Sequence, residues 1–413
     1  MKSETSVLIS GSGPVGLLLA LGLGKAGIDT LLVEKHPNLQ PATRACVYMP
    51  VVVPILTKLG IFDKIQEEGF FNRVGIVWRD SEGQPLAQLP LDDPKPDQFG
   101  GVLQLGQWKL AQIILNEIKK YPNVEVCYGA ECVGIQDQPE EEQAKVMINE
   151  RFTTTETLIK ADYVIGADGS NSSVRRMMCI PFEGFSYPWR MIGADVLYDF
   201  MSEENLAPLN FIVDPVDWGV IAFTGEEEGG ARPGSGKPPL WRIAYIEPAY
   251  LTATKEGYMS RAEKRIPECF MKHGSKQFKL LRAEPYVNSQ KVAAQGRKGR
   301  VLLTGDALHS NNPIGGLGLT GGICDAFAYG NALVRVLKKG ESDSLLTDCA
   351  NSRRNAWLTM TNVLSQGNIK RLYGFDEEGI GAREEFFSRL KVDESFSKDI
   401  RGKFDKMLPE TFE

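Results

Sequence analysis

The chain has 413 residues, of which 42% are hydrophobic and 24% are charged, and its formal net charge is −6. This composition is typical of a folded globular protein of two or three domains, and it excludes a disordered or collagen-like chain. No run of basic residues stands out, so we expect no nucleic-acid partner.

The seven cysteines are widely separated and form no CxxC pair. This spacing disfavours both a disulfide framework and a zinc site, and we expect no bound metal. We find no secretory leader, no lipidation signal and no apolar stretch long enough to cross a bilayer. The sequence therefore predicts a soluble, cytoplasmic protein without a membrane segment.

The N-terminal part reads as a β-α-β unit. Residues 7–10 predict a buried strand, residues 14–26 a helix that is apolar nearly all round, and residues 28–34 a second strand. The elements expected next are helices at 51–59 and 108–120, turns and hairpins at 81–101, and strands at 124–127, 132–135, 145–149 and 161–167.

From about residue 182 the pattern changes to strands without intervening helices, at 191–197, 211–213, 218–223 and 240–246. This pattern predicts an antiparallel sheet, with a long Gly/Pro loop at 225–239. A buried strand at 301–304 and a helix to about 337 follow, and the remainder reads as helical.

We therefore predict an α/β fold with three parts. A discontinuous, Rossmann-like domain is expected at 1–75, 98–180 and 285–335. A mainly antiparallel sheet domain is inserted at 76–97 and 181–284, and a helical C-terminal part covers 336–413.

The first glycine motif, GSGPVG, follows the first strand and opens the first helix. Gly11 permits a tight turn, Gly13 lets the backbone approach a pyrophosphate, and Gly16 lets helix and strand pack closely. Glu34 lies eighteen residues past Gly16, where a carboxylate can accept ribose hydroxyls. These flanks favour dinucleotide binding over a purely structural glycine turn. The cofactor-binding residues expected here are Gly11, Gly13, Pro14, Val15, Gly16, Glu34 and Lys35.

The second motif, ADGSNSSVRR, places Asp168 and Gly169 at a strand tip, where a capped structural turn is the favoured interpretation of the motif alone. The third motif, TGDALHSNNPIGGLGLTGG, places Asp306 at another strand tip, where it could bind polyol hydroxyls. Its glycines would let backbone lie against a flat ligand. For His309, a structural hydrogen bond is favoured over proton transfer.

Together the three motifs resemble the fingerprints of the single-component FAD-dependent aromatic hydroxylases, the flavin monooxygenases that include p-hydroxybenzoate hydroxylase and phenol hydroxylase. The match is collinear from residue 5 to about residue 335. The resemblance implies a p-hydroxybenzoate hydroxylase-like fold. It also implies a tightly bound FAD held by Glu34 at the adenosine ribose, Arg44 at the pyrophosphate, Gln107 near the ribityl chain, Asp168 and Gly169, Asp306 at a ribityl hydroxyl, Pro313 at the isoalloxazine, and Gly316, Gly318, Leu319 and Thr320 around the flavin.

The sequence departs from the family pattern in three places. The family commonly has Asn where Thr320 stands and a Gly where Thr43 precedes Arg44. The thioredoxin-like C-terminal domain of longer members is not evident. None of these departures affects the expectation of FAD binding.

The resemblance further implies that NADPH or NADH binds transiently and reduces the flavin. A flavin C4a-hydroperoxide formed with O2 would then hydroxylate a phenolic or other electron-rich aromatic molecule, including polyketide- or alkaloid-like compounds of secondary metabolism. The catalytic candidates are Pro313 beside the flavin and Arg190 and Tyr245 on the inserted sheet. Further candidates for the substrate site are Trp218, Phe223, Trp241, Arg242, Tyr48 and Tyr187.

Alternation along 241–246 puts Trp241 and Tyr245 on one face of a strand and Arg242 on the other, and either face could meet the flavin. Two alternatives remain open. The same flavin chemistry could perform epoxidation or Baeyer–Villiger oxidation of a natural-product scaffold. Alternatively, the chain could be a non-catalytic binding protein like the Rab escort and GDP-dissociation-inhibitor proteins. We expect a monomer or a homodimer.

Overall fold

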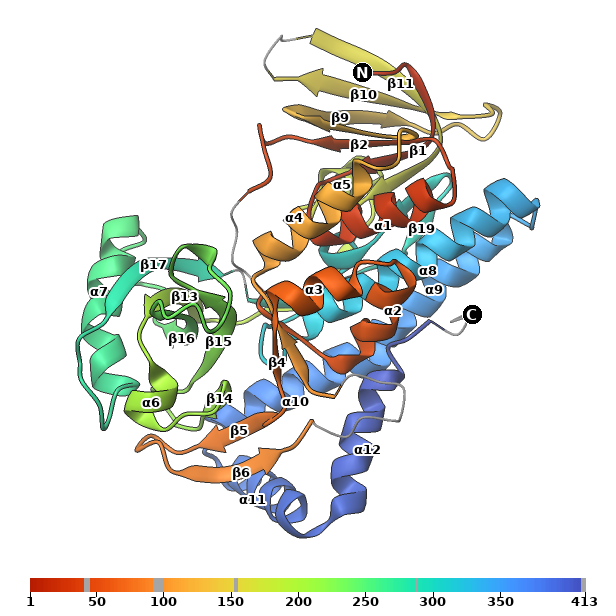
Figure 1. Ribbon diagram of the computed structural model, residues 1–413. Helices are drawn as coiled ribbons and strands as arrows, with labels where there is room; N and C mark the ends of the chain where they lie inside the picture. The colour runs from red at the N-terminus through yellow and green to blue at the C-terminus, as the bar shows by residue number, and fades with distance from the viewer. Residues whose placement is uncertain (41–44, 92–99, 152–154, 287, 410–413) are drawn as a thin grey trace.

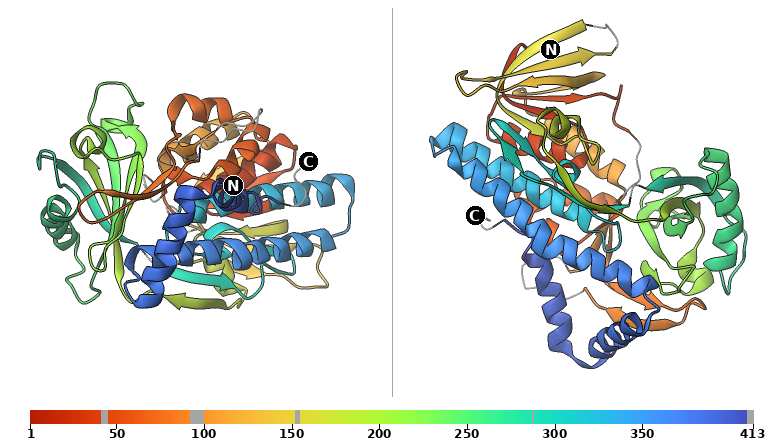
Figure 2. Two further views of the ribbon diagram at one scale, coloured as in Figure 1. Left: turned by 90° about the horizontal axis from the view of Figure 1, so that it is seen from below. Right: turned by 180° about the vertical axis from the view of Figure 1, so that it is seen from behind.

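A computed structural model describes residues 1–40, 45–91, 100–151, 155–286 and 288–409. Two sheets with different architectures form the body of the molecule, and the C-terminal helices lie against both (Figures 1 and 2). Within the described part of the chain, none of the helices combines the length and apolar character that crossing a bilayer requires.

The first domain is built on an eight-stranded sheet. Its parallel centre contains, in spatial order, β20 (Val301–Leu303), β11 (Thr155–Gly166), β1 (Glu4–Ser10), β2 (Thr30–Glu34) and β8 (Val124–Tyr128). Antiparallel strands complete it, namely β9 (Ala130–Gln136), β10 (Ala144–Glu150) and β19 (Arg297–Lys298). Helix α1 (Pro14–Lys25) packs against α4 (Gln107–Ile118) and α8 (Leu317–Lys339). The succession of β1, α1 and β2 confirms the predicted β-α-β unit. All three predicted glycine motifs lie at strand ends of this domain.

The sheet domain is a seven-stranded, mostly antiparallel sheet. In spatial order its strands are β17 (Lys279–Tyr286), β13 (Arg190–Leu197), β16 (Pro239–Glu247), β15 (Gly219–Glu227), β14 (Leu209–Ile212), β5 (Ile76–Arg79) and β6 (Pro85–Leu89). The one parallel pair is β14 with β5.

Our prediction that no helices lie between these strands is wrong. A short helix, α6 (Phe200–Glu204), follows β13, and α7 (Lys255–Cys269) follows β16. Helix α7 escapes the sequence pattern because only three of its residues, Tyr258, Ala262 and Ile266, are buried. The predicted loop at 225–239 begins later than expected, because β15 continues to Glu227, whose Oε1 accepts a hydrogen bond from the Gly234 N–H at 2.6 Å.

Two small sheets connect the domains. One contains β12 (Phe182–Ser186), β18 (Ser289–Ala293) and β21 (His309–Ser310), and the other contains β3 (Val47–Tyr48), β7 (Val102–Gln104) and β4 (Phe70–Asn72). Short helices α2 (Val53–Lys58), α3 (Phe62–Glu68) and α5 (Ser173–Met177) lie in the first domain. The C-terminal helices are α9 (Ser344–Ala356), a π-helical turn (Trp357–Thr361), α10 (Asn362–Tyr373), α11 (Glu377–Val392) and α12 (Glu394–Asp405), as the helical prediction requires.

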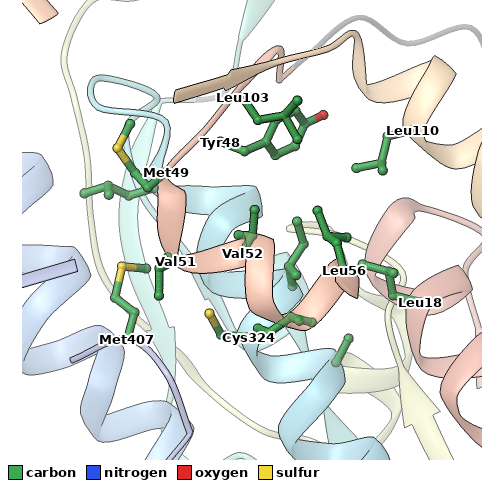
Figure 3. Close-up of a cluster of buried hydrophobic side chains, with 14 of the residues drawn as sticks. Leu18, Tyr48, Met49, Val51, Val52, Leu56, Leu103, Leu110, Cys324 and Met407 are labelled. Atoms are coloured by element: carbon green, nitrogen blue, oxygen red, sulfur yellow. The ribbon is translucent and has the colours of Figure 1, made fainter. Parts of the chain in front are cut away.

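The hydrophobic core shows which face of the sheet domain meets the first domain. Met191 and Ala244, on one face, belong to the same buried cluster as the core of the first domain. Ile192 and Ile243, on the other face, belong to a separate cluster with Ile266 of α7. We call these the inner and outer faces. Part of the shared cluster, between α1, α2 and α8, is drawn in Figure 3.

Candidate active site

The first glycine motif has the geometry of a nucleotide-binding turn. Gly11 has φ +112°, a conformation that favours glycine, and a Cβ on Gly16 would lie 2.1 Å from the Gly11 carbonyl oxygen. At Gly13, by contrast, an added Cβ would meet no atom of the described residues within 4 Å, apart from those of its chain neighbours. Open space therefore lies over Gly13, at the start of α1, whose first N–H groups have no partner within the helix.

Glu34 ends β2 beside this turn. Its Oε2 accepts hydrogen bonds from the Ser12 N–H at 2.9 Å and the Ser12 hydroxyl at 3.1 Å, and its Oε1 accepts one from the His36 N–H at 3.0 Å. A carboxylate offers about two acceptor sites on each oxygen, so Oε1, which accepts one hydrogen bond, can still receive a ribose hydroxyl. Lys35, the next residue, is exposed.

The Asp168-Gly169 turn combines a structural cap with an unsatisfied oxygen. Asp168 Oδ2 accepts hydrogen bonds from the Ser173 and Val174 N–H groups, at 2.7 and 3.1 Å, at the start of α5. Its Oδ1 is buried without a hydrogen-bond partner among the described residues. A buried, unsatisfied oxygen is costly, and a ligand that donates a hydrogen bond would relieve this cost.

The third motif presents exposed groups in an otherwise buried segment. Asp306 and Pro313 are exposed, although Gly305 and Ala307 beside the acid are buried. Gly316 has φ +66°, and a Cβ there would lie 2.9 Å from the Val47 carbonyl oxygen, so backbone is brought close at the start of α8. The half-buried Gly318 and Leu319 fall in the first turn of α8, where N–H groups are free and the helix dipole favours negative charge.

Thr320, the departure from the family pattern, uses its side chain inside the protein. Its hydroxyl donates to the Gly316 carbonyl at 2.7 Å and accepts from the Met49 N–H at 3.3 Å. Only its backbone is therefore suited to contact a flavin. Gln107 Oε1 accepts a hydrogen bond from the Ala45 N–H at 3.2 Å, whereas Arg44 lies outside the described residues.

His309 belongs to a buried ionic network that the sequence did not predict. Asp325 Oδ2 lies 2.8 Å from His309 Nε2, and Asp325 Oδ1 accepts a hydrogen bond from Arg353 Nε at 2.8 Å. Burial acts to raise the pKa of the Asp325 carboxyl, but His309 and Arg353 outweigh it and lower the pKa to about 2. The Gly305 N–H also donates to Asp325, at 3.2 Å. The network therefore holds the third motif in place through hydrogen bonds from Gly305 and His309 to Asp325, which favours a structural role for His309.

The structure places two of the three catalytic candidates on the outer face. Tyr245 lies on the outer face, in the cluster packed under α7, with its ring 6.0 Å from that of Phe270. Arg190 forms an ion pair with Glu247 at 2.9 Å and lies over the ring of Tyr258 in α7. Both residues therefore lie on the face that α7 covers, and Figure 1 shows α7 on the side of the sheet domain away from the first domain. Trp241 and Phe223 lie in the same outer cluster.

The inner face carries Arg242 instead. Its Nε donates to Asp195 Oδ1 and its Nη1 donates to the Tyr286 hydroxyl, both at 2.5 Å. Gly193 makes room for this arrangement, because a Cβ there would lie 2.3 Å from the Tyr286 hydroxyl oxygen. The neighbouring inner-face residues, Ala222 and Ala244 among them, are small.

An aromatic cluster borders this face. The ring of Trp189 lies 5.2 Å from Tyr187, 5.0 Å from Tyr373 and 6.2 Å from Trp218, between ring centroids. The Tyr187 hydroxyl accepts a hydrogen bond from Asn312 Nδ2 at 3.4 Å, next to Pro313. Of our aromatic candidates, Tyr187 thus lies against Asn312, the neighbour of Pro313, and Trp218 belongs to the aromatic cluster. Tyr48 is fully buried in the shared core (Figure 3).

These features fit FAD. The open space over Gly13 suits a pyrophosphate, Glu34 and Asp168 offer oxygens to hydroxyls, and the exposed Pro313 and the start of α8 suit a flat ring system. The FAD-binding-domain family matches residues 4–363.

Curated relatives and solved structures agree with this assignment. The chain is 31% identical over 375 residues to para-nitrophenol 4-monooxygenase of Pseudomonas sp. (strain WBC-3), covering 89% of this chain and 87% of that protein. It is 32% identical over 416 residues to 6-hydroxy-3-succinoylpyridine 3-monooxygenase of Pseudomonas putida (strain DSM 28022 / S16), covering 100% and 99%. The crystal structure of p-nitrophenol 4-monooxygenase from Pseudomonas putida DLL-E4 matches with a TM-score of 0.89 and 27% identity, over 99% and 100% of the two chains.

The chain therefore belongs to the FAD-binding-domain family and is an FAD-dependent aromatic monooxygenase. The predicted fold, cofactor and enzyme class are confirmed. Nothing in these comparisons supports the alternative of a non-catalytic, Rab escort-like binding protein.

Proposed function

From this membership we propose that the enzyme uses NADPH or NADH and O2 to hydroxylate a small phenolic or hydroxylated heteroaromatic ring. The ring binds between Pro313 and the inner face of the sheet domain. The observation that carries this proposal is the inner face itself. It places the buried Arg242, hydrogen-bonded to the partly buried Tyr286, beside small side chains, on the side of the sheet that packs against the first domain.

The side chains of this site suit an electron-rich ring with a polar substituent. Arg242 binds an anionic or polar substituent, because guanidinium groups form strong charge-assisted hydrogen bonds with oxygen acceptors. Trp189, Trp218 and Tyr373 line an apolar border that keeps water from the reacting atoms. Support also comes from the two named relatives, since p-nitrophenol and 6-hydroxy-3-succinoylpyridine each combine a ring hydroxyl with a polar substituent.

When bound, FAD accepts two electrons from NAD(P)H and activates O2. The protein contributes binding at Gly13, Glu34, Asp168 and Asp306. The first turn of α8 directs N–H groups and a positive dipole end at the ring, which favours negative charge there. The buried Asp325 network fixes the segment that carries Asp306 and Pro313.

The test is turnover by the purified, FAD-loaded protein with NADH or NADPH and a panel of phenols and hydroxypyridines. We expect one or more rings to stimulate NAD(P)H oxidation, with oxygenated product formed in step. Oxidation that yields only H2O2 with every ring would contradict the proposal. Product mass and NMR spectra separate hydroxylation from epoxidation and Baeyer–Villiger oxidation, which need the same cofactor. We also propose a monomer or homodimer that works in the cytoplasm, where NAD(P)H is supplied.

A further inference from the structure

Asn288 carries a buried side-chain amide that lacks hydrogen bonds within the described part of the chain. The residue is 5% exposed, and neither Oδ1 nor Nδ2 has a hydrogen-bond partner among the described residues. A carboxamide carries an acceptor oxygen and two N–H donors, and leaving them unsatisfied in the interior destabilises a protein. Gln290, two residues further on, is fully engaged, with bonds to Asn312 and Asn362. The unsatisfied amide of Asn288 therefore requires an explanation.

Asn288 lies on the strand face that carries Tyr187. The Tyr187 N–H donates to the Asn288 carbonyl at 3.0 Å, which extends the antiparallel pairing of β12 with β18 by one residue. Residues directly opposite each other on antiparallel strands project from the same face. Asn288 therefore shares a face with Tyr187, whose ring contacts Trp189 and whose hydroxyl lies against Asn312, beside Pro313.

The ring of Trp189, next to Tyr187, carries a second buried polar group that is unsatisfied. The indole Nε1 of Trp189 is buried and has no hydrogen-bond partner among the described residues. The rings of Tyr187 and Trp189 thus lie 5.2 Å apart, with an unsatisfied indole N–H on Trp189 and the unsatisfied Asn288 carboxamide on the strand face of Tyr187. Hydrophobic walls with a few unsatisfied polar groups are typical of a small-molecule site.

We propose that Asn288 binds the substrate and selects a ring with a donor and an acceptor on adjacent atoms, as in 2-hydroxypyridine and its 2-pyridone tautomer. The lactam edge of a 2-pyridone accepts from Nδ2 and donates to Oδ1 through two parallel hydrogen bonds. A phenol presents a single oxygen and cannot align both bonds. This inference rests on the proposed function, because it assumes that the oxidised ring lies at this wall.

The experiment measures binding rather than turnover. The FAD-loaded protein is titrated with 2-hydroxypyridine and with N-methyl-2-pyridone, which lacks the donor, and binding is followed by the flavin absorbance or by calorimetry. Asn288→Leu removes the amide at similar size, and Asn288→Asp keeps an acceptor but removes the donors. Asn351→Leu makes the same change at an exposed position of α9 and is the control.

We expect the wild type and the control to bind 2-hydroxypyridine at least tenfold more tightly than its N-methyl derivative, which corresponds to about 1.4 kcal/mol. Asn288→Leu should reduce this ratio to about twofold or less. Asn288→Asp, which keeps the acceptor for the ring N–H, should retain the ratio while binding both probes more weakly. Ligand-free Asn288→Leu should keep or raise the wild-type Tm, since leucine removes the unsatisfied groups, and its FAD content verifies folding.

A ratio that Asn288→Leu leaves unchanged overturns the inference, as does equal or undetectable binding of the two probes by the wild type. The two proposals fail separately. If the affinity ratio depends on Asn288 but no ring stimulates NAD(P)H oxidation, the proposed hydroxylation is wrong and the proposed binding role of Asn288 remains supported. If Asn288→Leu hydroxylates its substrate with wild-type kcat and KM, the role of Asn288 is wrong and the oxidation stands.

Discussion

Gly13 and Gly16 lie three residues apart in the first motif, but the structure predicts opposite effects of alanine at these two positions. At Gly16 the new Cβ would lie 2.1 Å from the Gly11 carbonyl oxygen, a backbone atom that cannot move without separating strand from helix. Such overpacking costs about 1–3 kcal/mol or more. At Gly13 a new Cβ would meet no described residue other than its chain neighbours within 4 Å, and φ −64° and ψ 167° suit alanine. The free energy of unfolding of the FAD-free Gly13→Ala protein should change by less than about 1 kcal/mol.

FAD affinity should respond in Gly13→Ala even though stability does not. The open space over Gly13 is where we place the pyrophosphate, so a methyl group pushes the phosphates away from the N–H groups of α1. We expect FAD affinity to fall by about 10- to 100-fold, or about 1.4–2.8 kcal/mol. Urea unfolding of the FAD-free protein measures stability, and quenching of flavin fluorescence measures FAD affinity.

The matched control for this pair is Gly22→Ala in the middle of α1, where the new Cβ would meet only Leu59 Cδ2 at 3.7 Å. This variant should bind FAD normally and be more stable by about 1 kcal/mol, because alanine favours helix. Wild-type FAD affinity in Gly13→Ala would refute the placement of the pyrophosphate. Equal destabilisation of the FAD-free Gly13→Ala and Gly16→Ala proteins would refute the steric reasoning.

Three further results are expected. Asp325→Asn should lower the free energy of unfolding at pH 7 by about 3–5 kcal/mol, because it breaks a buried ionic network. Because the folded-state pKa of Asp325 is lowered to about 2, its carboxylate stabilises the folded protein above about pH 4, and this stabilisation is lost as the pH falls towards 2. Urea unfolding across this range should show the loss in the wild type and not in the variant. Tyr245→Phe should leave kcat and KM within about twofold, because the ring lies on the outer face, and a tenfold change in steady-state assays would contradict that placement. Tyr286→Phe and Gly193→Ala should each raise the substrate KM about tenfold while FAD affinity stays constant, since both remove the hydrogen bond from Arg242 to the Tyr286 hydroxyl; unchanged KM values would exclude this pair from the site.

The parts of the fold that the sequence predicted correctly depend on local steric rules. Gly16 is required by its contact with the Gly11 carbonyl oxygen inside a single β-α-β unit, and the spacing of the motif is readable from the sequence alone. Gly11 is additionally required by a contact that the sequence could not show, because a Cβ there would lie 2.5 Å from the Ala167 carbonyl oxygen. The antiparallel sheet is likewise readable from the sequence, because alternation along 240–246 separates two faces correctly.

The choice between those two faces depends on packing between distant segments. Tyr245 seemed a good catalytic candidate because aromatic residues often line substrate sites, but α7 covers its face of the sheet. Helix α7 carries many charged residues and a proline, Pro267, so its sequence gives little sign of a helix that covers a sheet.

Interactions between residues far apart in sequence could not be predicted either. Asp325 and Arg353 are 28 residues apart, and the only local signal was an acidic residue within an apolar helical stretch. Asn288 has no local pattern at all. Its importance emerges only from its burial, its missing hydrogen bonds and its position opposite Tyr187.

The central claim is that the enzyme transfers one oxygen atom from O2 to a hydroxylated ring at the expense of NAD(P)H. The most direct measurement is turnover of the FAD-loaded protein under ¹⁸O₂, with product mass and NAD(P)H consumption followed together for each ring that stimulates oxidation. Our account predicts one ¹⁸O atom in the product for each NAD(P)H consumed. Product oxygen that derives from water, or NAD(P)H consumption that yields only labelled H2O2, would contradict it.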